Sequence, residues 1–161
     1  MKTYRILFVC MGNICRSPAG EATLRKMVNE EGLQDQIEID SAGTIGFHTD
    51  SPPDPRMHRA AANRNIHTGG KARQVFIEDL DTFDRVLAMD NANLSDLQNL
   101  AQSASQEDKI RAFCEYCVNY KDHKEVPDPY YGGNQGFELV LDLLEDGCRQ
   151  LLEEAKVAIR N

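Results

Sequence analysis

Residues 7–20 read LFVCMGNICRSPAG, and this stretch decides the fold. The apolar run from Ile6 to Val9 stops at Cys10, a short loop follows, and Arg16 opens a pattern typical of a helix. This order predicts a strand, a tight loop and a helix start. The N–H groups of such a loop and of the first helical turn point at one spot, which favours an anion. The sequence therefore predicts an anion cradle with a cysteine at its base.

The segments around this stretch alternate between strand and helix patterns. Strands are expected at Tyr4–Cys10, Gln36–Asp40, Arg85–Met89 and Ile110–Cys114. Helices are expected from Ser17 as N-cap to near Gly32, and then at Arg56–Asn65, Ile77–Phe83, Asn93–Ala104 and Phe137–Ile159. Ser41–Gly43 is expected to form a turn, and Thr44–Pro55 and Val126–Gly136 to form loops.

This alternation predicts an α/β fold, a parallel sheet with helices on both faces, as a single domain over residues 1–161. Ligands of such sheets bind beyond the carboxyl ends of the strands, at the point where the strand order reverses. Cys10, Ser41 and Asp90 all fall at the C-terminal ends of expected strands, so we expect them to share one crevice.

The net charge and the number of cysteines narrow the class of protein. The 161 residues carry a net charge of −8, and the excess of acid lies after residue 80. Without a basic run, nucleic acid and anionic membranes are not expected as partners. The N-terminal apolar run is too short for a signal peptide, and five cysteines is an odd count for a disulfide framework. We therefore expect a cytoplasmic protein with reduced thiols.

The spacing of Cys10 and Arg16 suits phosphate chemistry. Five residues separate the two side chains, which is the span a loop needs to wrap a tetrahedral dianion with backbone donors. The planar guanidinium of Arg16 can hold two phosphate oxygens at once. Thiols at helix N-termini beside a cation ionise readily, so Cys10 is expected to be a nucleophilic thiolate, with Ser17 as a hydrogen-bond donor to it.

A leaving alcohol or phenol oxygen also needs a proton donor. Among 26 carboxylates, Asp128 stands out because Pro127 and Pro129 stiffen its loop and two tyrosines follow that could shield it from water. The residues alone leave open whether Asp128 donates the proton or only caps a turn.

Five segments together, Cys10–Pro18, Ser41, Asp54–Arg56, Ala88–Asp90 and Asp128–Tyr131, resemble the low-molecular-weight protein tyrosine phosphatases. The likeness spans nearly the whole chain in the same order. It implies a flavodoxin-like, doubly wound, four-stranded parallel sheet in a three-layer αβα arrangement. It also implies hydrolysis of phosphotyrosine in proteins and of small aryl phosphates, without a metal or cofactor.

The resemblance further implies a role for each site residue. Cys10 is the nucleophile that forms a cysteinyl-phosphate, Arg16 the phosphate clamp, and Asp128 the general acid and then the base. The implied phosphate-binding residues are Met11, Gly12, Asn13, Ile14, Cys15, Arg16 and Ser17. The implied supports of the loop are Asn13, Ser17 and Ser41. The implied walls of the aromatic slot are Met11, Ile14, Phe47, Tyr130 and Tyr131.

Three further expectations follow from the likeness. Cys15 can form a reversible disulfide with Cys10 that protects the nucleophile from irreversible oxidation. The expected partners are phosphotyrosine-containing proteins, with inorganic phosphate as product and competing ligand, and the chain is expected to be a monomer or to self-associate weakly. One departure stands out, because Gly69–Lys71 lies where many relatives place a histidine that supports Asn13, and nearby His67 has a different offset.

Three alternative functions are weighed against this one. A thiol-dependent arsenate reductase needs two relay cysteines near the third strand, and Phe83–Asn99 contains none. Phosphoarginine phosphatases of this type tend to carry threonine where Ile14 stands, whereas Ile14 and Phe47 favour a flat phenyl ring. A module that only binds phosphotyrosine would usually lack the nucleophile or the acid, and both are present.

One further motif lies outside this scheme. Cys114 and Cys117 form a Cys-x-x-Cys with His123 nearby, which would be half of a zinc site, but no second pair completes it. Two partly buried or incidental thiols are the alternative interpretation. Cys148 is expected in the core of the last helix.

Overall fold

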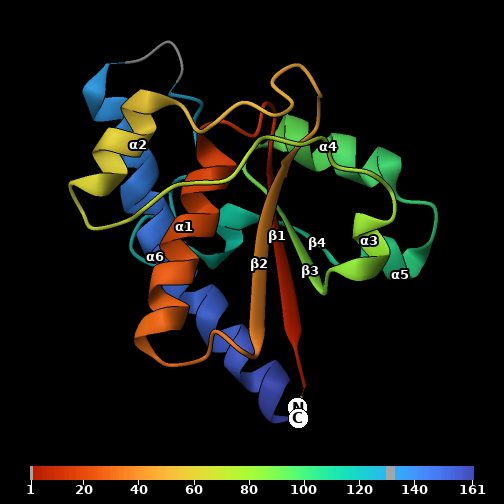
Figure 1. Cartoon of the computed structure of the whole chain (residues 1–161). Coiled ribbons are helices and arrows are strands. Elements are labelled where there is room, and N and C mark those ends of the chain that lie inside the picture. The colour runs from red at the N-terminus through yellow and green to blue at the C-terminus, as the bar shows by residue number, and fades with distance from the viewer. Residues whose placement is uncertain (1, 130–132) are drawn as a thin grey trace.

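The computed structural model describes residues 2–129 and 133–161, and it contains a four-stranded sheet among helices (Figure 1). The strands are β1 Tyr4–Cys10, β2 Ile37–Gly43, β3 Arg85–Ala88 and β4 Ile110–Ala112. The α-helices are α1 Arg16–Glu30, α2 Pro55–Ala62, α3 Asp79–Thr82, α4 Asn91–Leu100, α5 Ala104–Glu107 and α6 Asn134–Arg160. A 3-10 helix, η1, covers Phe113–Tyr116.

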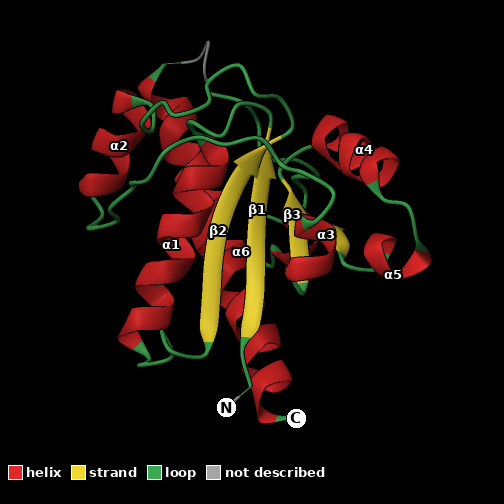
Figure 2. Cartoon of the chain, turned by 45° about the vertical axis from the view of Figure 1, so that its right-hand side comes forward, coloured by secondary structure: helices red, strands yellow, loops and turns green. Residues whose placement is uncertain are grey.

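The sheet is entirely parallel and has the order β2-β1-β3-β4. The chain moves outward from β1 to β2 and then returns past β1 to β3, so the strand order reverses beside β1. All strand arrows point to one end of the molecule, where the connecting loops gather (Figure 2). The expected doubly wound, three-layer αβα architecture is confirmed, and Cys10 lies at its reversal point.

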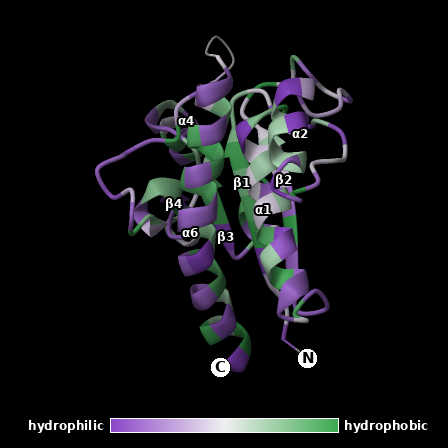
Figure 3. Ribbon diagram, turned by 90° about the vertical axis from the view of Figure 1, so that its left-hand side faces the viewer, coloured by the Kyte–Doolittle hydropathy of each residue, from purple (hydrophilic) through white to green (hydrophobic). Residues whose placement is uncertain are grey.

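Helices cover both faces of the sheet because β1 is apolar on both sides. Ile6 and Phe8 pack into one core with α1, α2 and α6, while Leu7 and Val9 pack into a second core with α3 and α4. Figures 1 and 2 show α1, α2 and α6 on one side and α3, α4 and α5 on the other. Figure 3 shows hydrophobic colour along β1 and alternating hydrophilic and hydrophobic turns along α6, as expected for a helix with one buried stripe.

Most helix ends differ from the sequence-based expectation by a few residues, Ala104 begins a separate helix, α5, and α6 begins at Asn134. Three further differences have a clear physical reason. Helix α1 begins at Arg16 rather than after a Ser17 cap, because the Ser17 hydroxyl lies 3.0 Å from the Cys10 sulfur instead. Ser41–Gly43 is the end of β2 and not a turn, since these residues pair with Phe8–Cys10. Strand β4 stops at Ala112, and Cys114 lies in η1.

The start of β1 and the end of α6 both lie at the end of the sheet opposite the loops (Figures 1 and 2). Within the described residues, we find no helix that has both the length and the apolar character needed to cross a membrane.

Candidate active site

The loop between β1 and α1 exposes its backbone donors on one side. The carbonyls of Cys10, Met11 and Ile14 accept backbone N–H groups from the loop that follows β2, at 2.9, 3.1 and 2.6 Å. The N–H groups of residues 11–16, by contrast, donate to no acceptor within residues 2–129 and 133–161. With the carbonyls tied outward, these donors and the start of α1 form a cradle for an anion.

Cys10 lies at the base of this cradle and is buried. Its sulfur is 3.0 Å from the Ser17 hydroxyl and accepts the Ser17 backbone N–H at 3.4 Å. Ser17 therefore contacts the Cys10 sulfur through both its side chain and its backbone. Cys15 differs, because burial raises the pKa of its thiol and the charge of Cys10 raises it further. Burial therefore keeps Cys15 protonated, and Cys10 is the thiol that lies beneath the backbone donors.

Asn13 holds the loop in an uncommon backbone conformation. Its φ of 56° lies in the left-handed region, which asparagine tolerates better than most residues. The side-chain amide donates to Ser17 and Ser41 at 2.8 and 3.0 Å, and its oxygen accepts the Arg73 backbone N–H at 3.0 Å. Asn13 is 3% exposed, so these bonds are made out of water and fix the loop from behind.

The support behind Asn13 continues through a carboxylate that sequence reasoning did not identify. The Ser41 hydroxyl donates to Glu21 at 2.7 Å, and Glu21 pairs with Arg25. Burial raises the pKa of Glu21, against the opposing effect of the Ser41 hydrogen bond. Because Ser41 and Asn13 are 28 residues apart, only the pairing of β2 with β1 brings this chain of contacts together.

The position where relatives carry a histidine is occupied differently. Gly69 and Gly70 line a small cavity of about 60 Å³ beside Asn13, Glu21 and Ser41. The exposed His67 lines a different cavity, and among the described residues it makes no hydrogen bond to Asn13. The Asn13 oxygen instead accepts the backbone N–H of Arg73.

Arg16 is 3% exposed and links three segments. One terminal nitrogen donates to Asp90 at 2.7 Å and to the Val126 carbonyl at 3.0 Å, and the other lies 3.6 Å from Asp128. Burial opposes the guanidinium charge, yet Cys10 and Asp90 raise the pKa of Arg16 above its usual range. The same Asp90 carboxylate caps α4 by accepting the Asn93 N–H, so the end of β3 orients the clamp.

These side chains meet around one cavity of about 220 Å³. Asp128 lies at its edge with 39% of its side chain exposed, and Phe47 is 83% exposed. The cavity is lined by Cys10, Met11, Gly12, Ile14, Cys15, Arg16, Phe47, His48 and Asp128. Two predicted slot residues, Tyr130 and Tyr131, lie outside the described residues.

His48 lines the cavity although its sequence context shows no ligand spacing. Its ring contacts Phe47 edge-on, with centroids 4.9 Å apart. A Cβ added at Gly12 would come within 2.9 Å of the His48 ring, and one at Gly43 within 2.7 Å of the Met11 carbonyl. The two glycines therefore allow the loops to approach closely. The one available clue to His48 was its place beside Phe47 in the long loop.

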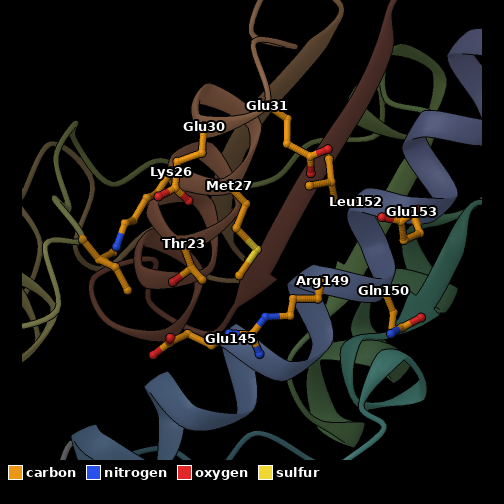
Figure 4. Close-up of a pocket in the computed structure, with 11 residues that line it drawn as sticks. Thr23, Lys26, Met27, Glu30, Glu31, Glu145, Arg149, Gln150, Leu152 and Glu153 are labelled. Atoms are coloured by element: carbon orange, nitrogen blue, oxygen red, sulfur yellow. The ribbon is translucent and has the colours of Figure 1, made fainter.

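A larger cavity of about 460 Å³ lies elsewhere, between α1 and α6 (Figure 4). Carboxylates of Glu30, Glu31, Glu145 and Glu153 surround it together with the cations of Lys26 and Arg149 (Figure 4). It has neither a nucleophilic thiol nor an array of backbone donors. The chemistry therefore marks the smaller cavity as the active site.

Comparisons with known proteins agree with this geometry. Residues 5–160 match the family model described as "Low molecular weight phosphotyrosine protein phosphatase". A putative low molecular weight protein-tyrosine-phosphatase of Synechocystis is 45% identical over 148 residues, covering 92% of this chain and 94% of its own. The pig low molecular weight phosphotyrosine protein phosphatase is 39% identical over 156 residues, covering 96% and 97%. The crystal structure of an Entamoeba histolytica protein tyrosine phosphatase superposes with a TM-score of 0.93 at 38% identity, covering 97% of this chain and 99% of that one.

Proposed function

The chain belongs to the low molecular weight phosphotyrosine protein phosphatase family, and we propose that it hydrolyses phosphotyrosine through a cysteinyl-phosphate formed on Cys10. The observation that carries this proposal is the cradle itself. A buried thiol lies beneath backbone N–H groups that have no other acceptor in the described residues, with a buried guanidinium beside it. Such preorganised donors stabilise charge that develops on phosphoryl oxygens.

The first step is attack of the Cys10 sulfur on phosphorus. The N–H groups of the loop and the Arg16 guanidinium hold the three non-bridging oxygens, and Ser17 keeps the sulfur oriented. Asp128, whose carboxylate lies 3.6 Å from Arg16 at the edge of the cavity, is positioned to protonate the departing phenol oxygen. The sulfur–phosphorus bond forms as the phosphorus–oxygen bond breaks, and tyrosine leaves neutral.

The second step hydrolyses the cysteinyl-phosphate and regenerates the free enzyme. Asp128, now a carboxylate, accepts a proton from a water that attacks phosphorus, and the sulfur–phosphorus bond breaks to release inorganic phosphate. Because the product carries the same oxygens as the substrate, inorganic phosphate competes for the same cradle. Cys10 leaves as a thiolate, stabilised by the Ser17 contacts.

The cavity favours an aryl phosphate over a phosphoguanidine. Ile14 and Met11 provide apolar surface, and the exposed Phe47 ring also lines the cavity. A flat phenyl ring can pack between such walls, whereas a guanidinium would lose water without gaining a polar partner from Ile14. We therefore propose phosphotyrosine proteins as substrates. All five cysteines are free thiols, which suits a reducing compartment such as the cytoplasm.

The decisive experiment compares Asp128→Asn with Asp122→Asn, an exposed carboxylate in the same segment. A general acid contributes about 10²- to 10⁴-fold, so Asp128→Asn should slow turnover of phosphotyrosine by about that factor. The loss should be much smaller for an aryl phosphate whose leaving group needs no proton. Asp122→Asn should behave like the wild type with both substrates.

The nucleophile is tested separately. Cys10→Ser should abolish turnover while inorganic phosphate still binds, and rapid acid quenching of the wild type should trap phosphate on the tryptic peptide of residues 6–16. Phosphotyrosine, phosphoserine, phosphoarginine and arsenate should be assayed side by side. Faster turnover of phosphoarginine than of phosphotyrosine would overturn the proposed substrate class.

A further inference from the structure

Cys114 and Cys117 form a dithiol that the proposed mechanism does not use. Both lie at η1, where the Cys117 N–H donates to the Cys114 carbonyl at 3.1 Å. In a 3-10 turn, side chains three residues apart lie on the same side, and three residues advance about 6 Å. A disulfide needs Cα atoms about 4.4–6.8 Å apart. The backbone therefore already holds these two thiols at a separation that a disulfide can span.

The two thiols have unequal surroundings. The Cys117 thiol donates toward the Leu143 carbonyl of α6 at 3.6 Å. A hydrogen bond from Cys117 lowers the pKa of Cys114, and the same interaction, with burial, raises the pKa of Cys117. Cys114 is thus the better nucleophile, and Cys117 is the protonated partner beside it.

The surrounding structure holds this turn firmly. The Phe113 ring packs against Phe8 and against Gly147 of α6, where an added Cβ would lie 2.4 Å from the ring. The carboxylate of Asp146 accepts the backbone N–H groups of Val118, Asn119 and Tyr120, each at 3.0 Å. Since both sides of the turn are anchored to α6, a new bond between the sulfurs needs no rearrangement of the elements.

A metal site does not account for the pair. Among residues 2–129 and 133–161, no group of three or more His, Cys, Asp or Glu side chains is arranged to hold an ion. Cys114 and Cys117 are 8% and 6% exposed, whereas Cys148 is fully buried, so a small oxidant has more access to the pair than to Cys148.

We propose that Cys114 and Cys117 are a second oxidation site, converted by hydrogen peroxide to a reversible intramolecular disulfide. The Cys114 thiolate attacks one peroxide oxygen, so that a sulfenic acid forms and the other oxygen leaves as water after taking a proton. The Cys117 sulfur then attacks the sulfenic sulfur, and hydroxide leaves with the Cys117 proton as a second water. Two thiols and one peroxide give one disulfide and two waters, a two-electron oxidation.

Oxidation of Cys114 and Cys117 should not lower the catalytic activity. The segment from Cys117 to Asp128 is held independently at its far end, because the Val126 N–H donates to the Met89 carbonyl at 2.8 Å and the Val126 carbonyl accepts Arg16. We therefore expect the Cys114–Cys117 disulfide to form without loss of activity. Loss of activity should follow oxidation of Cys10 alone.

Trypsin distributes the five cysteines over three peptides. Cys10 and Cys15 fall in the peptide of residues 6–16, Cys114 and Cys117 in 112–121, and Cys148 in 125–149. The full-length protein is treated with graded hydrogen peroxide, quenched in acid, unfolded, alkylated and digested. We expect peptide 112–121 to lose two hydrogens and both alkylation sites, and to regain them after treatment with dithiothreitol. The Cys148 peptide should stay fully alkylated.

Two variants sharpen this test. In Cys10→Ser, peptide 112–121 should oxidise as in the wild type, which makes the result independent of the proposed catalytic mechanism. In Cys114→Ala, no disulfide should form within that peptide. The proposal is overturned if peptide 112–121 keeps two free thiols at a peroxide dose that fully oxidises peptide 6–16. It is equally overturned if that peptide gains oxygen as sulfinic acid, or links to a different peptide.

Discussion

Replacing Asn13 tests how much of the cradle depends on its support. Glycine and alanine both remove three buried hydrogen bonds, to Ser17, Ser41 and Arg73. At a net of about 1 kcal/mol each, the loss of unfolding free energy is about 3 kcal/mol for either variant. Alanine must also adopt the left-handed φ of 56°, which costs about 1–2 kcal/mol. Glycine avoids that cost, but its greater freedom in the unfolded chain lowers the stability of Asn13→Gly by about 0.4–1 kcal/mol.

The expected order of stability is therefore wild type, then Asn13→Gly, then Asn13→Ala, with the last two about 1 kcal/mol apart. Urea denaturation measures both differences in unfolding free energy. The values of kcat and KM for an aryl phosphate measure the effect on the site. Asn65 provides a matched control, because its φ is 61° and its exposed side chain makes none of these hydrogen bonds. Asn65→Gly should be nearly neutral, and Asn65→Ala should reproduce only the backbone cost.

Two results would refute this reasoning. If Asn13→Gly lost no more stability than Asn65→Gly, the three hydrogen bonds would not support the loop. If both Asn13 variants were destabilised but kept the wild-type kcat, the loop geometry would not depend on Asn13.

Three further changes probe other contacts. Gly147→Ala should lower the unfolding free energy by about 1–3 kcal/mol, because the new methyl meets the Phe113 ring; a gain in urea stability, as in an open helix, would contradict the packing. Asp90→Asn removes the carboxylate that pairs with buried Arg16, so stability should fall by about 3 kcal/mol and KM for an aryl phosphate should rise; an unchanged KM would show that the clamp is oriented without it. Burial raises the pKa of Glu21 in the fold, so its ionisation costs stability as pH rises through that pKa. Glu21→Gln should therefore gain stability relative to the wild type as the pH rises above about 4, the ordinary pKa of a glutamate side chain, and a constant difference in urea midpoint would rule this out.

The local part of the site was predictable because it is continuous in the sequence. A strand that ends at Cys10 and a helix that begins at Arg16 leave only a short loop between them, so the cradle follows from local backbone physics. The same holds for the Asp54 cap of α2, whose carboxylate accepts the Arg56 N–H. Elements of the fold were predictable for the same reason, since hydrophobic periodicity is a local signal.

Local sequence patterns did not predict the support of the loop, because it depends on partners distant in sequence. The family resemblance alone pointed to Ser41, whose hydroxyl does accept from Asn13. The Arg73 N–H reaches Asn13 across 60 residues, and no side-chain pattern marks a backbone donor. Ser41 looked like a turn residue by composition, but pairing with Phe8 extends its backbone and aims its hydroxyl at Asn13 and Glu21. Tertiary pairing decided both positions.

The parts of the site differ in how strongly the fold determines their position. Cys10, Ser41 and Asp90 come from β1, β2 and the end of β3, whose register is set by the sheet. Asp128 comes from a loop, and its neighbour Val126 is fixed by Met89 and Arg16. One buried guanidinium contacts Asp90, Val126 and Asp128. In the proposed mechanism, phosphate binding and the position of Asp128 therefore depend on the same side chain. Substitution of Arg16 should therefore weaken phosphate binding and slow proton transfer together, whereas substitution of Asp128 should slow only proton transfer.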